Sequence, residues 1–578
     1  MFIIDLNIKF LEKNKKMNIK SRIMIKIYQV IKPLKLFMLI TSLAIFASVV
    51  NAQVKPNIII ILADDMGFSD IGSYGGEILT PNLDKLAKGG VRFRQFYNAA
   101  RCCPTRACLL TGLYPHQAGV GHMTSDQGEP SYRGDISKNC VTIAEVLKSN
   151  GYKTYLSGKW HVTKDVDYWK TWLPEDKKKY TSKHNWPTQR GFDEFFGTIH
   201  GAGSYYNPST LTRNNTPIEA GKGFYYTDAI STHADEFIRN HARSDADKPF
   251  LCYIAYTAPH WPLHALPEDI KKYKGKFDKG WDKVREERMA KMLKMGIIDS
   301  KWKLSDRDKE VPAWENTDNK QWWAACMEVY AAMVDRMDQG IGKVLRALDE
   351  TGQLDNTLIL FLADNGGCAE VLTEKWGRSL QLPFHLKDGA LYKPGNDLTR
   401  VPGPEDTYMS YSTEWANASN TPFRMFKSFI HEGGVSTPLI AHWPAGIKSP
   451  GRITNQVGHV IDLMATCLDV AGAVYPKTYG GNSIIQQEGQ SIQPVFVNKT
   501  FKHNPIGWEH EGNRGFRDGK WKLVSNSKDW ELYDIVADRT ELHNLAAIYP
   551  KITGEMIGKY EKWASRVGVI NWQERKKK

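Results

Sequence analysis

Four apolar runs, separated by stretches with helical periodicity, most constrain how this chain of 578 residues can fold. The first run, residues 55–63, contains four consecutive isoleucines, which is typical of a strand buried on both faces. The other runs lie at 152–156, 248–257 and 357–363, and helical patterns occupy 81–89, 141–149 and 321–352. Strands that alternate with helices predict an α/β fold with a mainly parallel central sheet flanked by helices.

Polar side chains follow each of the four runs: Asp64 and Asp65, Lys159 and His161, His260, and Asp364 and Asn365. Ligands bind outside the carboxyl ends of the strands in such sheets, so we expect these side chains to share one site. The carboxylates and the amide supply hard oxygen donors, which select Ca²⁺ or Mg²⁺ over zinc. Any one of these acids alone is better explained as a helix cap or a loop carboxylate, but two pairs at two strand ends favour a metal site.

The stretch from Ala99 to Gly112 contains the pattern C-x-P-x-R, with Cys102, Pro104 and Arg106 at its fixed positions. It places a thiol on a tight turn at the start of an apolar run that is expected to be helical. A helix N-terminus with an arginine nearby is suited to a tetrahedral oxyanion, because free N–H groups and a fork of donors converge there. A buried turn or a disulfide staple is the alternative for these clustered cysteines.

With its Leu-Thr-Gly tail, this stretch resembles the signature of the type I, formylglycine-dependent sulfatases. The resemblance spans about 55–570, and residues 415–424 resemble the bacterial arylsulfatase-like branch. It implies an alkaline-phosphatase-like fold and a maturation enzyme that converts Cys102 to formylglycine, whose hydrated aldehyde is the nucleophile. The chain departs from many relatives at Val435–Pro438, where an arginine is common.

The resemblance also implies a role for each polar residue of the predicted site. One Ca²⁺ would be bound, together with residue 102, by Asp64, Asp65, Asp364 and Asn365. The sulfate group would be bound by Arg106, Lys159 and Lys427. His260, helped by Lys427, would protonate the departing alcohol, and His161 would deprotonate the remaining hydroxyl of the nucleophile. For any single histidine or lysine, a structural or solvent-exposed role is the alternative.

The N-terminus has the three-part pattern of a signal peptide, residues 1–52. A basic segment from Lys9 to Lys35 precedes an apolar run at 36–50, which is short for a membrane span, and small residues follow at 50–52. We therefore expect an exported, periplasmic or secreted protein with no stable membrane anchor, although an uncleaved anchor is the alternative. These 52 residues account for +7 of the formal net charge of +13, and no nucleic-acid motif accompanies the remaining +6.

Residues 53–470 are predicted to form the catalytic domain, with a charged insertion at 265–320 on its surface for which a helical conformation is one option. Residues 471–578 are predicted to form a smaller α+β subdomain, with antiparallel strands at 515–524 and 530–534 and a helix at 549–566. The five cysteines outside the motif are widely spaced and show no zinc pattern, although one or two disulfides are possible in an exported protein.

The predicted function is hydrolysis of sulfate monoesters on a polysaccharide or its oligosaccharides, either algal, such as ulvan or carrageenan, or from a host. Two aromatic and histidine-rich stretches, His200–Asn207 and His260–His264, are candidates to line a sugar pocket, although ordinary packing explains them equally well. Two alternatives remain open. One is a formylglycine-type phosphodiesterase or phosphonate monoester hydrolase, and the other is a non-catalytic glycan-binding relative.

Overall fold

The isoleucine-rich strand β1 (Asn57–Ala63) lies inside a ten-stranded sheet, as its apolar sequence predicts. It pairs in parallel with β7 (Phe250–Ala255) on one side and with β8 (Thr357–Ala363) on the other. The computed structural model describes residues 18–20, 23–24, 27–28, 55–164, 183–379, 386, 388–526 and 529–575.

The sheet is mainly parallel, with the strand order β10-β2-β9-β8-β1-β7-β3-β4-β5-β6. Strand β9 runs antiparallel to both of its neighbours, and β5 runs antiparallel to β4 and β6. The remaining bounds are β2 Val91–Tyr97, β3 Lys153–Gly158, β4 Glu194–Thr198, β5 Leu211–Arg213, β6 Thr216–Pro217, β9 Ser436–His442 and β10 Arg452–His459. The predicted α/β class with a mainly parallel sheet is confirmed.

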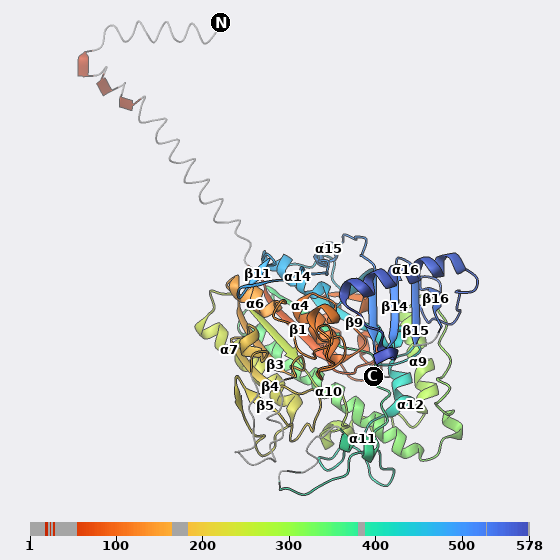
Figure 1. The fold of residues 1–578 in the computed structure, drawn as a ribbon. Coiled ribbons are helices and arrows are strands. Elements are labelled where there is room, and N and C mark those ends of the chain that lie inside the picture. The colour runs from red at the N-terminus through yellow and green to blue at the C-terminus, as the bar shows by residue number, and fades with distance from the viewer. Residues whose placement is uncertain are drawn as a thin grey trace. The chain divides into compact units, whose positions relative to one another are not determined.

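Alternate residues of β1 face two hydrophobic cores, one on each side of the sheet. Ile59 and Ile61 pack in the core that contains α3 (Pro81–Lys88), α7 (Tyr226–Ser244) and α10 (Lys320–Glu350). The intervening residues Ile58, Ile60 and Leu62 pack in the opposite core. That second core contains α4 (Cys102–Thr111), α6 (Ile143–Ser149) and α14 (Asp462–Ala471), and Figure 1 shows α4 and α6 beside β1. Helices therefore cover both faces of the sheet.

The charged stretch 265–320, predicted as a surface insertion, contains two α-helices and one 3₁₀ helix and also contributes buried aromatic side chains. It forms α8 (Pro267–Lys271), α9 (Gly280–Met295) and the 3₁₀ helix η5 (Trp314–Asn316). The side chains of Tyr273, Phe277 and Trp281 are fully buried. These aromatic side chains pack into the core, whereas many lysines of the same stretch are exposed. The high charge of the stretch therefore gives no sign of its buried aromatic residues.

Shorter elements connect these parts of the fold. Their bounds are η1 Gly72–Tyr74, α5 Pro115–Ala118, η4 Pro187–Arg190, α11 Glu374–Ser379, α12 Ser412–Ser419, α13 Glu432–Val435, β11 Thr478–Tyr479, β12 Asn482–Ser483, α15 Gln493–Phe496 and α17 Trp572–Arg575.

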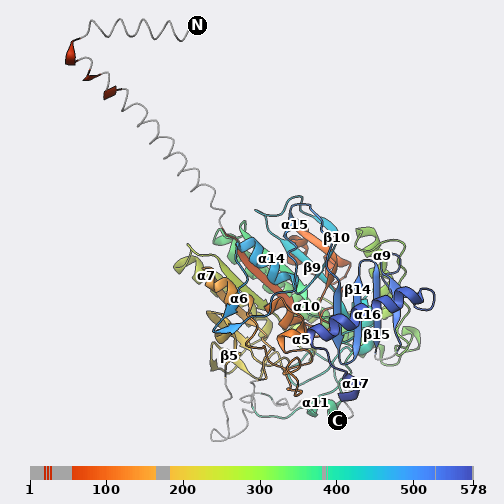
Figure 2. The ribbon, with the colours of Figure 1, turned by 45° about the horizontal axis from the view of Figure 1, so that its top comes forward.

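A second, four-stranded antiparallel sheet follows near the C-terminus, in the order β13-β14-β15-β16. Its strands are Ile506–His510, Asn513–Asp518, Trp521–Asn526 and Glu531–Asp534. Helix α16 (Pro550–Val567) packs on this sheet and crosses β14 and β15 in Figure 2. The segment predicted as one strand at 515–524 is instead two strands joined by a turn at Gly519. Residues 56–578 form one compact unit, so a boundary near residue 470 stays a prediction.

Two predictions concern features outside these layers. All eight cysteines are described and all are free thiols, so the structure contains neither of the disulfides that the sequence leaves possible. Within the described residues, no helix is long and apolar enough to span a membrane. The apolar run 36–50 of the predicted signal peptide lies outside the described residues.

Candidate active site

The motif cysteine is the first residue of α4, as the sequence predicts. Arg101 is the N-cap residue in an extended conformation, and Ala100 before it adopts a positive φ of 62°. The hydroxyl of Thr105 donates to the carbonyl oxygen of Asp364 at 2.6 Å and accepts from the backbone of Ala99 at 2.9 Å. These bonds join the first turn of α4 to the end of β8. Cys102 is buried at the carboxyl edge of the sheet.

The two acidic pairs lie side by side because β1 and β8 are parallel and in register, with Ala63 opposite Ala363. The backbone N–H of Asp65 donates to Asp364 Oδ1 at 3.1 Å. The amide of Asn365 donates to Asp65 Oδ1 at 2.7 Å. The predicted cluster of hard oxygen donors therefore forms, and its members are fully buried.

Two oxygens of this cluster are left without a hydrogen bond from any described residue, namely Asp64 Oδ1 and Asn365 Oδ1. A buried oxygen without a partner is costly and calls for a ligand. Burial, followed by the charge of Asp64, raises the pKa of Asp364 well above its usual value, which reflects two carboxylates held close together. The donor set and its unpaired oxygens fit a hard divalent cation.

Two buried cations face these carboxylates from other elements. Arg106 on α4 contacts Asp364 Oδ2 at 2.9 Å and Asp64 Oδ2 at 3.5 Å. Lys159, directly after β3, is ion-paired with Asp64. Burial raises the pKa of Asp64, but the neighbouring cations, Lys159 foremost, outweigh it and lower this pKa to about 2. The carboxylate is therefore ionised.

Lys427 and His260 form a second pair on the other side of Asp65. The Lys427 ammonium contacts Asp65 Oδ2 at 2.7 Å and lies 3.5 Å from His260 Nε2. His260 Nδ1 donates to the carbonyl of Trp261 at 2.6 Å. Burial lowers the pKa of His260, whereas for Lys427 the charge of Asp65 outweighs burial and raises the pKa. The lysine holds a proton next to a neutral imidazole.

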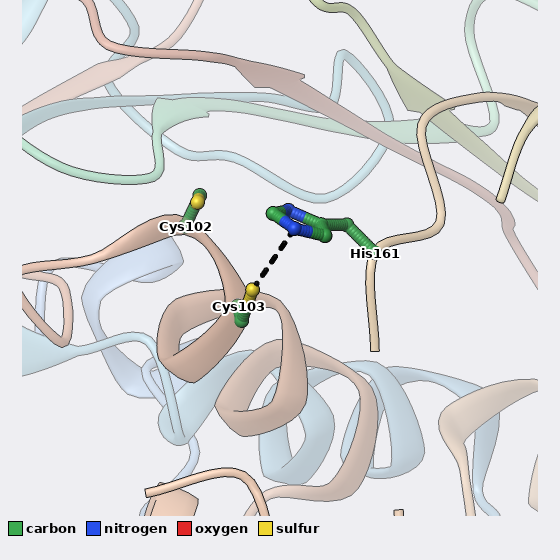
Figure 3. A group of neighbouring side chains, drawn as sticks. All are labelled: Cys102, Cys103 and His161. Atoms are coloured by element: carbon green, nitrogen blue, oxygen red, sulfur yellow. Dashed lines mark hydrogen bonds between the residues drawn. The ribbon is translucent and has the colours of Figure 1, made fainter. Parts of the chain in front are cut away.

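His161 lies against the first two cysteines of the motif stretch, and Figure 3 shows its ring facing Cys102 and Cys103 on the first turn of α4. Its Nε2 is 3.3 Å from Cys103 Sγ. Burial lowers the pKa of His161 to about 3, so the ring is neutral at pH 7. A hydrogen bond from the Cys103 thiol, followed by the charge of Lys159, lowers the pKa of Cys102 well below its usual value despite burial. The structure thus brings every predicted site residue into one cluster.

Arg101 and Glu370 also lie at this site, although neither was predicted from the sequence. Arg101 Nη1 contacts Glu370 Oε1 at 2.8 Å and Ser428 Oγ at 2.9 Å. The other oxygen of Glu370 accepts from Trp261 Nε1 at 2.8 Å and lies 3.9 Å from Lys427 Nζ. Glu370 follows β8 within a glycine- and proline-rich stretch, so no local pattern marks it. The position of Arg101 next to the motif cysteine was the available signal.

Part of the predicted sugar pocket is ruled out. Tyr205 is 1% exposed and its hydroxyl donates to the carbonyls of Thr257 and His260. His264 is fully buried and hydrogen-bonded to the carbonyl of Thr407. These rings hold loops together and are not available to a sugar.

The family model described as Sulfatase matches residues 56–473, which include the whole ten-stranded sheet and all the predicted site residues. The chain belongs to the sulfatase family. A second model, described as N-sulphoglucosamine sulphohydrolase, C-terminal, matches residues 423–562. This second match covers Lys427 together with the small antiparallel sheet. Membership of the sulfatase family makes the chain a sulfuric ester hydrolase.

Individual relatives resemble this sulfatase over most of their length. An uncharacterized sulfatase of Schizosaccharomyces pombe is 33% identical, over 89% of this chain and 94% of the relative. An arylsulfatase of Klebsiella aerogenes is 31% identical, over 77% of this chain and 92% of the relative. The crystal structure of Ps i-CgsB in complex with k-i-k-neocarrahexaose has a TM-score of 0.62 and 26% identity, and the match covers 90% of this chain and 95% of that one.

Proposed function

We propose that this sulfatase removes sulfate from a polysaccharide or its oligosaccharides, with Cys102 converted to formylglycine by a maturation enzyme. The observation that carries the proposal is the position of Cys102. It starts α4 at the carboxyl edge of the sheet, among three buried cations and two histidines. In the converted chain, the hydrated aldehyde supplies the hydroxyl that attacks sulfur.

The cations of the site suit the charge of a sulfate ester. Arg106, Lys159 and Lys427 are buried and fixed by ion pairs with the acidic cluster. Preorganised positive groups in a water-poor site stabilise the charge that spreads over the sulfate oxygens in the transition state. These three side chains therefore bind and orient the sulfate group.

The two histidines have different proton chemistry. His260 Nε2 lies 3.5 Å from the Lys427 ammonium, and His260, helped by Lys427, is proposed to protonate the departing alcohol. His161 is neutral and faces residue 102 from the loop after β3, so its ring can take a proton from a hydroxyl on residue 102. This division of roles agrees with the one that the family resemblance implies.

The acidic cluster is proposed to hold Ca²⁺. Asp64, Asp65, Asp364 and Asn365, together with residue 102, would be its ligands, and the unpaired oxygens of Asp64 and Asn365 support this assignment. Bound there, the cation would polarise a sulfate oxygen.

A carbohydrate substrate is supported by the oligosaccharide in the Ps i-CgsB complex. We also propose that residues 1–52 are a removed signal peptide and that the enzyme acts in the periplasm or outside the cell. Export suits a polysaccharide substrate, which is too large to enter a cell intact.

The test is release of inorganic sulfate from a panel of sulfated polysaccharides and their enzymatically cut fragments. The protein is co-produced with a formylglycine-generating enzyme, and conversion of Cys102 is verified by peptide mass. We expect release from one glycan, reduced at least a thousandfold in Cys102→Ala. The control is Cys108→Ala on the same helix, which should retain activity. Equal release by Cys102→Ala, or turnover of aryl phosphodiesters without any sulfate release, would refute the proposal.

A further inference from the structure

We infer that, before Cys102 is converted, Cys102, Cys103 and His161 form a binding site for a thiophilic cation such as Zn²⁺. Each of the three residues offers one ligand atom, and these atoms lie within 4.8 Å of one another. Cys103 Sγ and His161 Nε2 are already 3.3 Å apart. In Figure 3 both thiols lie on the first turn of α4, on the side that faces the imidazole ring.

The donor set decides which cation the site takes. Two thiolates and one imidazole are soft or borderline ligands, which favour Zn²⁺ over Ca²⁺ or Mg²⁺. Two thiolates also neutralise the charge of a divalent cation, which matters because the site is buried. Three protein ligands leave a fourth tetrahedral position for water.

The neighbouring oxygen cluster has the opposite preference. Asp64 and Asp65 lie with His260 in a separate group of possible ligands, and their carboxylates are suited to hard cations. The active site therefore contains two adjacent cation sites of different chemistry. We therefore expect Zn²⁺ to bind at the thiol site and Ca²⁺ at the carboxylate site.

The protein holds the three ligands on fixed elements. Cys102 and Cys103 belong to α4, and His161 follows β3 with a positive φ of 54°. All three residues are at most 5% exposed. Among the described residues, the thiols are the hydrogen-bonding partners of the His161 ring. Its other nitrogen, Nδ1, is buried and makes no hydrogen bond with a described residue.

Binding of the cation and conversion of Cys102 exclude each other. Each thiol releases its proton to solvent when it ligates the cation, so uptake of one Zn²⁺ by both cysteines releases up to two protons. Conversion replaces the sulfur of Cys102 and leaves only two of the three ligands. We therefore expect the site in the unconverted chain only, where a bound Zn²⁺ would also occupy the position of the nucleophile.

The test uses the full chain produced without a formylglycine-generating enzyme, freed of metal and kept reduced with a phosphine. Co²⁺ is titrated in first, because a thiolate-to-cobalt charge-transfer absorption reports thiolate ligands directly. Zn²⁺ is then added to displace it. We expect one equivalent of Co²⁺ with that absorption, displaced by Zn²⁺, and a loss of affinity of at least tenfold in Cys103→Ser.

Two controls make the result specific. Cys108→Ser changes a buried cysteine of the same helix outside the group, and it should bind as the unchanged chain does. The converted chain, whose fold is compared with the unchanged one by circular dichroism, should bind at least tenfold more weakly. Absence of the charge-transfer absorption, or equal affinity of Cys103→Ser and the converted chain to the unchanged one, would overturn the inference. None of these measurements involves substrate, so failure here does not bear on the proposed sulfatase reaction.

Discussion

At the scale of single residues, two oxygen atoms distinguish a cation site from an ordinary buried ion-pair network. Asp64 Oδ1 and Asn365 Oδ1 make no hydrogen bond within the described part of the chain. The other polar atom of each side chain is paired, because Asp64 Oδ2 contacts Lys159 and Asn365 Nδ2 donates to Asp65. Leaving such an atom unsatisfied costs about 1–3 kcal/mol. The two unpaired oxygens lie on hard donors at the same edge of the sheet, which is the arrangement that a bound divalent cation would satisfy.

Calcium is therefore expected to stabilise the fold through Asn365. In urea unfolding, Ca²⁺ at about one hundred times its dissociation constant should raise the free energy of unfolding by about 2.7 kcal/mol relative to excess chelator. Asn365→Ala should lose most of this gain. The control is Asn240→Ala on the exposed side of α7, which should keep it. A full calcium response in Asn365→Ala would show that this amide is not a ligand.

The site residues also show what sequence alone can locate. Asp64 and Asp364 are predictable because each ends a recognisable apolar strand, and parallel strands bring their carboxyl ends together. Glu370 and Arg101 are not, because their ion pair joins a loop after β8 to the N-cap of α4. Their proximity depends on how two loops fold back over the sheet, and no periodicity encodes that.

At the scale of elements, strand β8 matches its predicted bounds of 357–363 because an uninterrupted apolar run has sharp ends. Strands β2 and β9 were not predicted. Strand β2 alternates apolar and polar residues and so lacks the continuous apolar run on which the prediction rested, and Pro438 lies inside β9. The sequence likewise does not reveal that α9 buries Trp281, because charged residues are interspersed along the whole helix.

The end of strand β3 determines where Lys159 and His161 lie. The strand ends at Gly158, which has a φ of 120° and directly precedes Lys159. A Cβ at this position would lie 2.0 Å from the carbonyl oxygen of Ala255 in the neighbouring strand. Neither the contact nor the backbone conformation tolerates a side chain.

We expect Gly158→Ala to displace Lys159 and His161 relative to Cys102. Sulfatase kcat/KM should fall at least tenfold and the free energy of unfolding by about 2 kcal/mol or more. The matched control is Gly554→Ala on the open face of α16, where a Cβ meets no atom and alanine favours the helix by about 0.5–1 kcal/mol. Unchanged kinetics and stability in Gly158→Ala would show that this glycine does not hold the loop after β3 in place.

At the scale of the whole molecule, a buried network of four charges joins the small antiparallel sheet to the segment that carries Lys427. Glu432, five residues after Lys427, is ion-paired with Lys522 on β15 at 2.7 Å and with Arg539 at 2.8 Å. Glu541 contacts Lys522 at 2.8 Å and accepts from the backbone N–H of Glu432. All four side chains are fully buried. The network therefore holds the segment that carries Lys427 against the C-terminal sheet, and the second family model covers both.

The pH dependence of stability should report this network. Burial raises the pKa of Glu432, but Lys522 and Arg539 outweigh it and lower the pKa to about 2, against 4.5 for an unperturbed glutamate. A pKa that is lower in the folded state stabilises the fold above the unfolded value and loses that effect as pH falls through the folded one. The contribution of Glu432 is thus complete at pH 7 and roughly halved at pH 3.

Replacing Glu432 with glutamine should cost about 3 kcal/mol at pH 7, because two cations remain buried with one partner. The difference from the unchanged chain should shrink between pH 5 and pH 3, since the unchanged chain loses the same stabilisation by protonation. Urea unfolding at a series of pH values measures this, with the exposed Glu561→Gln on α16 as the control that should show no difference. A cost that stays constant with pH would mean that Glu432 acts through packing and not through its charge, and the C-terminal sheet would then be held by its apolar contacts alone.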